Sequence, residues 1–240
     1  MSEPQTIETP KIGVMIATPV KFYAREYIVF SRLIEDLRAL SVDPSCPYEF
    51  VWATIDMGVV PARNKLVANF RKSECRWLCF VDYDVEISAA DILRLLSKKL
   101  PVIGGLYTTK EKNPHWVATF LFEAQAQKET VVQVVELGTG AGKLYHREVF
   151  DQLEKAFPQV VYTDRDTGER LFGFFQHAVV VHDMQMAGDL LPEDYFCDFL
   201  CRMAQISVWC DTSIKLKHRG GNGVLYPEGA WPAIPCMEKA

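Results

Sequence analysis

The chain has 240 residues, of which 49% are hydrophobic and 24% are charged, and its net charge is −5. These values are typical of a globular protein with a sizeable core. They exclude a membrane-spanning chain, which needs roughly 18 successive apolar residues, and a protein whose overall charge attracts nucleic acid. The seven cysteines are odd in number and lie mostly in apolar surroundings, so we expect a reducing, cytoplasmic location rather than a disulfide-linked secreted protein.

The first hundred residues alternate predicted strands and helices. Residues 1–10 are polar and lack the pattern of a signal peptide, and we expect them to form a disordered tail. Continuous apolar runs predict buried strands at residues 12–18, 50–55, 77–81 and 101–105. Apolar residues at helical spacing predict helices that begin at residues 23, 61 and 89. This alternation predicts a parallel sheet with helices on both faces.

The second half of the chain predicts a mixed arrangement. A hairpin is predicted from residues 116–123 and 131–136, and a turn between short strands at residues 164–168. Helices are predicted at residues 146–155 and 192–204, and late extended segments at residues 207–210 and 214–216. We therefore expect a single α/β domain over residues 11–220, followed by a Gly- and Pro-rich tail at residues 221–240.

Asp82 and Asp84, one residue apart, directly follow the predicted buried strand at 77–81. Two carboxylates at the end of such a strand are costly unless positive charge meets them. Hard divalent cations such as Mg²⁺ or Mn²⁺ are natural partners, and they commonly arrive bound to substrate phosphates. The alternative role of helix capping falls more naturally to Ser88 with Asp91. The motif therefore predicts a site for a metal and a phosphorylated ligand.

Polar side chains also stand at the ends of other predicted strands. The set at these ends is Thr18, Asp56, Asp82 and Asp84. In parallel sheets with flanking helices, ligands bind outside the carboxyl ends of the strands. The sequence therefore predicts one ligand-binding edge that these side chains share.

Other motifs favour no site of their own. The segment Gly138–Lys143 resembles a phosphate-binding P-loop, but the first glycine of that motif would fall at Leu137, and Leu144 replaces its Ser or Thr. The five histidines show no metal-binding spacing. The cysteine pairs at positions 75 and 79 and at 197 and 201 are better explained as small buried hydrophobic residues than as zinc ligands.

Five features follow one another along the chain. They are Asp82-x-Asp84 after a strand, a strand with Gly104 and Gly105, the segment starting at Gly138, the pair Glu193-Asp194 at a helix start, and His218 after a late strand. In this order they resemble GT-A glycosyltransferases of the glycosyltransferase family 2 type, over residues 11–220. A chain this short is similar to the stand-alone members found in phage genomes.

The resemblance implies an α/β, GT-A (Rossmann-like) fold, with a mostly parallel central sheet flanked by helices and a mixed acceptor-side half. Residues 11–110 would bind the nucleotide and residues 111–220 the acceptor. The residues that it assigns to the nucleotide sugar are Thr18, Pro19, Asp56, Arg63, Asn64, Asp82, Tyr83, Gly104, Gly105 and Gly138. It assigns a Mn²⁺ or Mg²⁺ cofactor to Asp84, Asp82 and His218. It assigns general-base catalysis to Asp194, beside Glu193.

The implied reaction is a metal-dependent, inverting transfer of a sugar from a nucleotide diphosphate, with UDP as the first candidate, to a hydroxyl acceptor. Candidate acceptors are 5-hydroxymethylpyrimidines in viral DNA, which would place the enzyme in a host cytoplasm, and a cell-envelope polysaccharide or glycolipid. Two alternatives stay open. One is nucleotidyl transfer, for which the segment after the first strand is a poor match, and the other is sugar or nucleotide binding without catalysis.

A DNA acceptor would need a basic groove with stacking side chains near the site. The basic residues available for it are Lys110, Lys112, His115, Arg165, Arg170, Lys215, Lys217, His218 and Arg219. The aromatic residues available for it are Trp116, Phe172, Phe174 and Phe175. The same residues are equally well explained as scattered surface charges and core aromatics, so both interpretations are kept.

Overall fold

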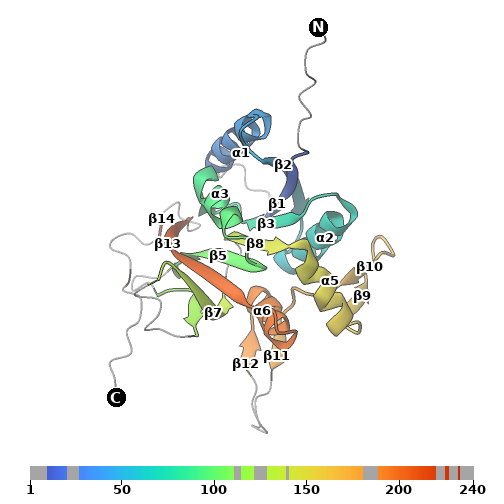
Figure 1. The fold of residues 1–240 in the computed structure, drawn as a ribbon. Coiled ribbons are helices and arrows are strands. Elements are labelled where there is room, and N and C mark those ends of the chain that lie inside the picture. Colours follow the sequence, from blue (N-terminus) through green and yellow to red (C-terminus); the bar gives the residue numbers. More distant parts are fainter. Residues whose placement is uncertain are drawn as a thin grey trace, which may run out of the picture.

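The computed structural model describes residues 10–20, 27–110, 115–121, 129–138, 141–180, 189–219, 225–226 and 232. Within these residues a central β-sheet carries helices on both faces, and two small hairpins lie at its periphery (Figure 1). The predicted tails and Lys112 lie almost wholly outside the described residues. No helix of the described part is both long enough and apolar enough to cross a membrane.

The central sheet contains ten strands of the described residues. They are β1 (Ile12–Val20), β2 (Tyr48–Asp56), β3 (Trp77–Val81), β4 (Val85–Glu86), β5 (Val102–Tyr107), β6 (Ala118–Phe120), β7 (Val131–Leu137), β8 (Ala141–His146), β13 (Val208–Arg219) and β14 (Leu225–Tyr226). The helices are α1 (Tyr27–Val42), α2 (Val59–Lys72), α3 (Ala89–Ser97), α5 (Arg147–Ala156) and α6 (Glu193–Met203). The hairpins pair β9 (Val161–Thr163) with β10 (Arg170–Phe172), and β11 (Ala178–Val180) with β12 (Asp189–Leu191).

The order of the strands across the sheet is β2-β1-β3-β8-β5-β13-β7-β6, with β4 and β14 both paired to β13. Strands β2, β1 and β3 run parallel to one another, and β5 runs parallel to β13. The strand β8 lies antiparallel between β3 and β5, and β7 is antiparallel to both β13 and β6. The predicted hairpin of β6 and β7 is thereby confirmed.

Alternation along the central strands places apolar side chains on both faces of the sheet. In β3 all five residues are buried: Leu78 and Phe80 join one apolar cluster, and Trp77, Cys79 and Val81 join the other. The first cluster packs against α2, α5 and α6, whereas the second packs against α1 and α3. The predicted α/β class, with a central sheet flanked by helices, is confirmed (Figure 1).

Two details of the sheet differ from the prediction. The sheet is mixed rather than mostly parallel, because residues 141–146, read from the sequence as a glycine-rich approach to a helix, form the antiparallel strand β8. The two late extended segments are one strand, β13, whose pairing with β5 shifts between Asp211 and Lys215. A bulge of this kind interrupts the alternation of side chains, so a single strand looks like two.

The predicted starts of α3 and α6 are confirmed, that of α2 is two residues too late, and the predicted start at residue 23 lies outside the described residues. The Ser88 hydroxyl accepts a hydrogen bond from the backbone N–H of Asp91, and the Asp91 carboxylate accepts one from the backbone N–H of Ser88, so the predicted capping box of α3 is confirmed. The helix α2 begins at Val59, two residues before Pro61. The helix α6 begins at Glu193, directly after Pro192. Both acidic residues of the Glu193-Asp194 pair therefore lie in the first turn of a helix.

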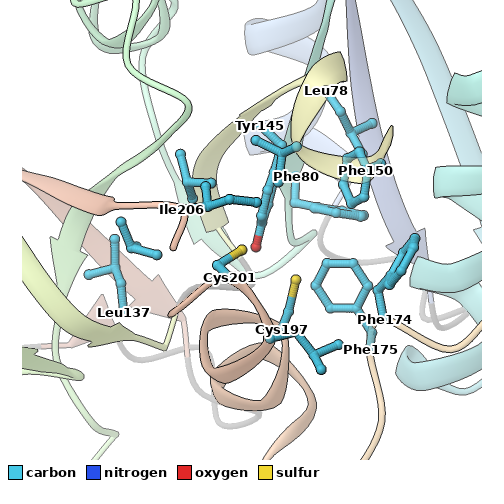
Figure 2. Packing of buried hydrophobic residues seen from close by; sticks show 14 of the residues in the cluster. Leu78, Phe80, Leu137, Tyr145, Phe150, Phe174, Phe175, Cys197, Cys201 and Ile206 are labelled. Atoms are coloured by element: carbon cyan, nitrogen blue, oxygen red, sulfur yellow. The ribbon is translucent and has the colours of Figure 1, made fainter. Parts of the chain in front are cut away.

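The core beneath α6 is rich in aromatic side chains. Phe80, Tyr145, Phe150, Phe174 and Phe175 pack against one another, with ring centroids 5.2 to 6.1 Å apart (Figure 2). Phe174 and Phe175 are fully buried. The interpretation of these two residues as stacking groups for a nucleic acid is therefore wrong, because no ligand base can reach them.

The cysteines behave as small hydrophobic residues. The six that the structure describes are free and buried. Burial raises the pKa of the Cys79 thiol to about 12, so it stays protonated at neutral pH. The prediction that the cysteines at 75, 79, 197 and 201 are small buried residues is confirmed.

Candidate active site

The candidate site lies where the carboxyl ends of β1, β3 and β5 meet the end of β13. A pocket of about 180 Å³ opens there. Its lining residues are Pro19, Val20, Met57, Val59, Asp82, Tyr83, Asp84 and His218. The lining combines apolar side chains with the carboxylates of Asp82 and Asp84 and the imidazole of His218. This combination suits a ligand that has both a flat apolar part and charge.

Arg63 is the buried cation of this site. Its side chain is 2% exposed, and Nη2 donates to both carboxylate oxygens of Asp82 at 3.2 and 3.3 Å. Its Nη1 lies 3.8 Å from Oε1 of Glu193. The guanidinium also faces the rings of Phe80 and Phe175. Burial alone would lower the pKa of Arg63, but the surrounding carboxylates outweigh it and raise the pKa, so Arg63 stays charged.

Asp84 is held by two donors on the same oxygen. Lys110 Nζ lies 2.6 Å and His218 Nε2 lies 3.2 Å from Oδ2 of Asp84. Burial alone would raise the pKa of Asp84, but the hydrogen bonds from His218 and Lys110 outweigh it and keep the pKa below its ordinary value. Asp84 is therefore ionised at neutral pH, which any role in cation binding requires.

The donors at this point fit a divalent cation in part. A carboxylate oxygen lies beside an imidazole whose other nitrogen, Nδ1 of His218, is buried and has no hydrogen-bond partner in the described part of the chain. Carboxylate and imidazole together suit Mn²⁺, and carboxylate suits Mg²⁺. Since these protein donors do not form a complete set, phosphate oxygens and water would have to supply the remaining ligands.

Asp82 titrates unusually high. Burial raises the pKa of Asp82 to about 7, although Arg63 opposes the shift. The unfolded value is about 4, so between about pH 4 and pH 7 the folded protein keeps a proton that the unfolded chain has lost. This carboxyl group therefore lowers the stability of the fold as the pH rises through that window.

We expect Asp82→Asn to make the melting temperature fall less steeply between pH 4 and pH 7 than in the wild type. The reason is that the amide removes the linked proton from the folded state. Thermal melts across this range in a chelating buffer measure the effect, with Glu86→Gln on β4 as the control. A melting curve that runs parallel to the wild type at every pH would contradict the assignment.

Glu193 and Asp194 reach the same site from the other half of the chain. Asp194 is 8% exposed, and its Oδ1 accepts a hydrogen bond of 3.0 Å from the backbone N–H of Tyr195. Both carboxylates contribute to the raised pKa of Arg63 and of Asp82, which places them close to these residues. Both residues lie in the first turn of α6, where the helix dipole is positive.

The other residues predicted to bind the nucleotide sugar differ in their surroundings. Pro19 and Tyr83 line the pocket, and Thr18 is fully buried behind them. Asp56 ends β2 and is exposed outside the pocket lining. Asn64 donates to the carbonyl of Phe175 and accepts from its N–H, so its amide holds the core segment that carries this ring. Nucleotide contacts by these residues stay predictions.

The three predicted glycines have a packing role inside the protein. A Cβ atom at Gly104 would lie 2.9 Å from Leu137, and one at Gly105 would lie 2.7 Å from Ile214. A Cβ at Gly138 would lie 2.4 Å from Val117. Glycine is therefore needed at these positions because neighbouring side chains leave no room for a Cβ atom. A contact of these glycines with the donor sugar stays a prediction.

Sequence reasoning missed Tyr107 as a member of the site. It ends β5, and its ring centroid lies 5.1 Å from that of His218. Burial raises the pKa of Tyr107, and the carboxylates of Asp194 and Asp82 raise it further. The sequence placed this tyrosine just after the predicted strand at 101–105, at the edge where ligands are expected. Only the structure shows that it lies close to Asp82 and Asp194.

No protein-family model matches the chain, and no curated protein matches it. The crystal structure of GalNAc-T7 with UDP, GalNAc and Mn²⁺ is similar over 88% of this chain, at 10% sequence identity and a TM-score of 0.45. This chain spans only 44% of that structure's length. A putative glucose-1-phosphate thymidylyltransferase from Bacillus anthracis, in complex with sucrose, is similar over 60% of this chain and 75% of its own, at 12% identity and a TM-score of 0.33.

Proposed function

We propose that this protein is a glycosyltransferase that moves a sugar from a nucleotide diphosphate, UDP in the first instance, to a hydroxyl acceptor. The observation that carries the proposal is that four carboxylates from two distant parts of the chain meet at one edge of the sheet. They are Asp82, Asp84, Glu193 and Asp194. Such a site can serve a cation on one side of a sugar and a base on the other.

The pocket supports the donor half of this proposal. Its apolar side, with Pro19, Met57 and Val59, offers a surface for a flat nucleotide base. Asp84 and His218 would hold the divalent cation, with Asp82 beside them. When bound, the cation neutralises the charge that builds up on the leaving diphosphate.

Asp194 is the proposed general base. The acceptor oxygen forms a bond to the anomeric carbon, the bond from that carbon to the diphosphate oxygen breaks, and the acceptor proton passes to the carboxylate of Asp194. A single displacement of this kind inverts the configuration of the anomeric carbon. The burial of Asp194 in the first turn of α6, close to Arg63 and Asp82, supports the role.

The acceptor proposed first is a 5-hydroxymethylpyrimidine in DNA, and an envelope glycan is the second candidate. Lys215 and Lys217 support the first, because both are exposed on the strand that leads to His218. Transfer assays with hydroxymethylated duplex, unmodified duplex and oligosaccharide separate the two. Transfer to DNA should fall steeply with added salt, because lysine contacts to phosphate release counterions.

We expect UDP with Mn²⁺ to raise the melting temperature of the wild type by several degrees. A ligand at about 100 times its dissociation constant stabilises the folded state by about 2.7 kcal/mol, which corresponds to a shift of this size. Thermal shift assays with UDP, UMP, CTP and ATP, each with and without Mn²⁺, measure it. A shift with ATP or CTP and none with UDP would contradict the proposal and favour nucleotidyl transfer.

A further inference from the structure

Lys143 and Asp198 form an ion pair inside the core, apart from the pocket. Both side chains are fully buried, and Nζ of Lys143 bonds Oδ1 of Asp198. Each partner also binds Leu137, since Nζ donates to its carbonyl at 3.0 Å and its N–H donates to Oδ2 of Asp198 at 2.7 Å. These contacts join β8, the end of β7 and the helix α6 through directed bonds.

Stability alone does not account for this pair. Burying two charges costs several kcal/mol of desolvation, and replacing such pairs by apolar side chains of similar size often leaves stability equal or higher. A buried ion pair can instead ensure that the elements it joins adopt one defined arrangement. The elements joined here include the helix that carries the proposed base.

The apolar contacts of α6 with the core come from Phe196, Cys197, Leu200 and Cys201. On the face toward the aromatic core the helix presents Cys197 and Cys201, two small side chains (Figure 2). Apolar contacts are not directional, whereas the bonds of Asp198 to Lys143 and to the N–H of Leu137 have a defined geometry. Asp198 lies one turn after Asp194, on the same face of the helix. A shift by one residue would move the helix by about 1.5 Å and turn it by over a quarter of a revolution.

We propose that the buried cluster of Lys143, Asp198 and the backbone of Leu137 fixes the rotation and axial position of α6, and thereby places Asp194 and Glu193 beside Arg63. Lys143 and Asp198 are positioning residues, which act through the first turn of the helix. The inference rests on the proposed function for its effect on turnover, but the placement of the helix can be measured without any turnover.

The test is the double variant Lys143→Met/Asp198→Leu, which replaces the pair by apolar side chains of similar length. We expect it to stay folded and to melt a few degrees below the wild type, because no buried charge is left unpaired and only the backbone groups of Leu137 lose these partners. We expect kcat to fall by about 10- to 100-fold with the KM for the donor unchanged, since a displacement of about 1 Å costs rates of that order.

Hydrogen exchange supplies the readout that does not depend on catalysis. The N–H of Phe196 donates to the carbonyl of Pro192 in the first turn of α6. We expect the backbone amide protons of this turn to exchange faster in the double variant than in the wild type. The exchange rates of the amide protons in α5 should not change. A double variant with wild-type kcat, or with wild-type exchange in this turn, would overturn the inference. If the wild type shows no sugar transfer, the proposed function fails and the exchange result alone decides the inference.

A matched control separates the effect of a displaced α6 from the effect of a less stable fold. Leu95→Ala removes a fully buried side chain of α3, on the opposite face of the sheet, and should lower the melting temperature by creating a cavity. Its kcat, measured well below its melting temperature, should stay close to the wild type. An equal loss of kcat in Leu95→Ala would show that turnover follows stability alone, which would also overturn the inference.

Discussion

Replacing Asp84 by alanine is expected to lower turnover by roughly three orders of magnitude and to leave the fold intact. A cation that neutralises a leaving diphosphate contributes several kcal/mol to the transition state, and each 1.36 kcal/mol is a factor of ten in rate. The fold should persist because the partners of Asp84 are the side chains of Lys110 and His218, both of which keep some access to water. Steady-state transfer assays and a thermal melt measure the two effects.

Glu86→Ala provides the control for Asp84. It removes a carboxylate two residues further on, whose partner is Arg219 on β13, and it should keep near-wild-type turnover. Titration of Mn²⁺ into wild type and Asp84→Ala should show loss of binding only in the variant. Full activity of the wild type in excess chelator would contradict the metal assignment altogether.

Asp194→Asn is expected to lower kcat by about two to four orders of magnitude while binding of UDP with Mn²⁺ survives. An amide cannot accept the acceptor proton, and a positioned general base is worth a factor of this size. The amide is close in size to the carboxylate and can still accept the hydrogen bond from Tyr195, so the first turn of α6 should stay folded. Parallel measurements of kcat and of the UDP-induced thermal shift check both parts.

The neighbouring residue supplies the comparison for Asp194. Glu193 lies 3.8 Å from Arg63 and 4.0 Å from His177, so Glu193→Gln should perturb this buried charge pair and reduce kcat less than Asp194→Asn does. If Glu193→Gln has the larger effect, Glu193 is the base. If neither variant changes kcat, the base lies elsewhere, and a chain that binds UDP without any transfer would be a binding module.

Local patterns determined much of the fold and part of the site. Continuous apolar runs predicted β1, β3 and β5 because strands buried on both faces leave no polar positions. The run at residues 50–55 also predicted a buried strand, but β2 is the partly exposed edge strand of the sheet. Ser88 with Asp91 predicted the start of α3 because a cap acts within four residues. Asp82 and Asp84 could be selected from the sequence because their place after a buried strand is itself local.

Only the tertiary structure decided how distant charges meet. Arg63 proved to bind Asp82 and to face Glu193, a contact between α2, β3 and α6 that no local spacing encodes. Tyr107 joined the site for the same reason. Burial and charge pairing depend on which elements pack together, so the assignment of these residues required the packed structure.

The strand β8 is the part of the sheet that the sequence did not predict. By itself the sequence determined the alternation of strands and helices, the acidic motif and the acidic start of α6, since each depends on neighbouring residues. It could not place Lys143 in the core, because a lysine in a predicted segment reads as a surface residue until an acid is brought to it. The packing of α6 supplies that acid, Asp198, and backbone pairing with β3 and β5 makes residues 141–146 a central strand. The fold class was predictable because the alternation of strands and helices follows from local patterns. The mixed sheet was not, because the place of β8 depends on pairing with distant strands.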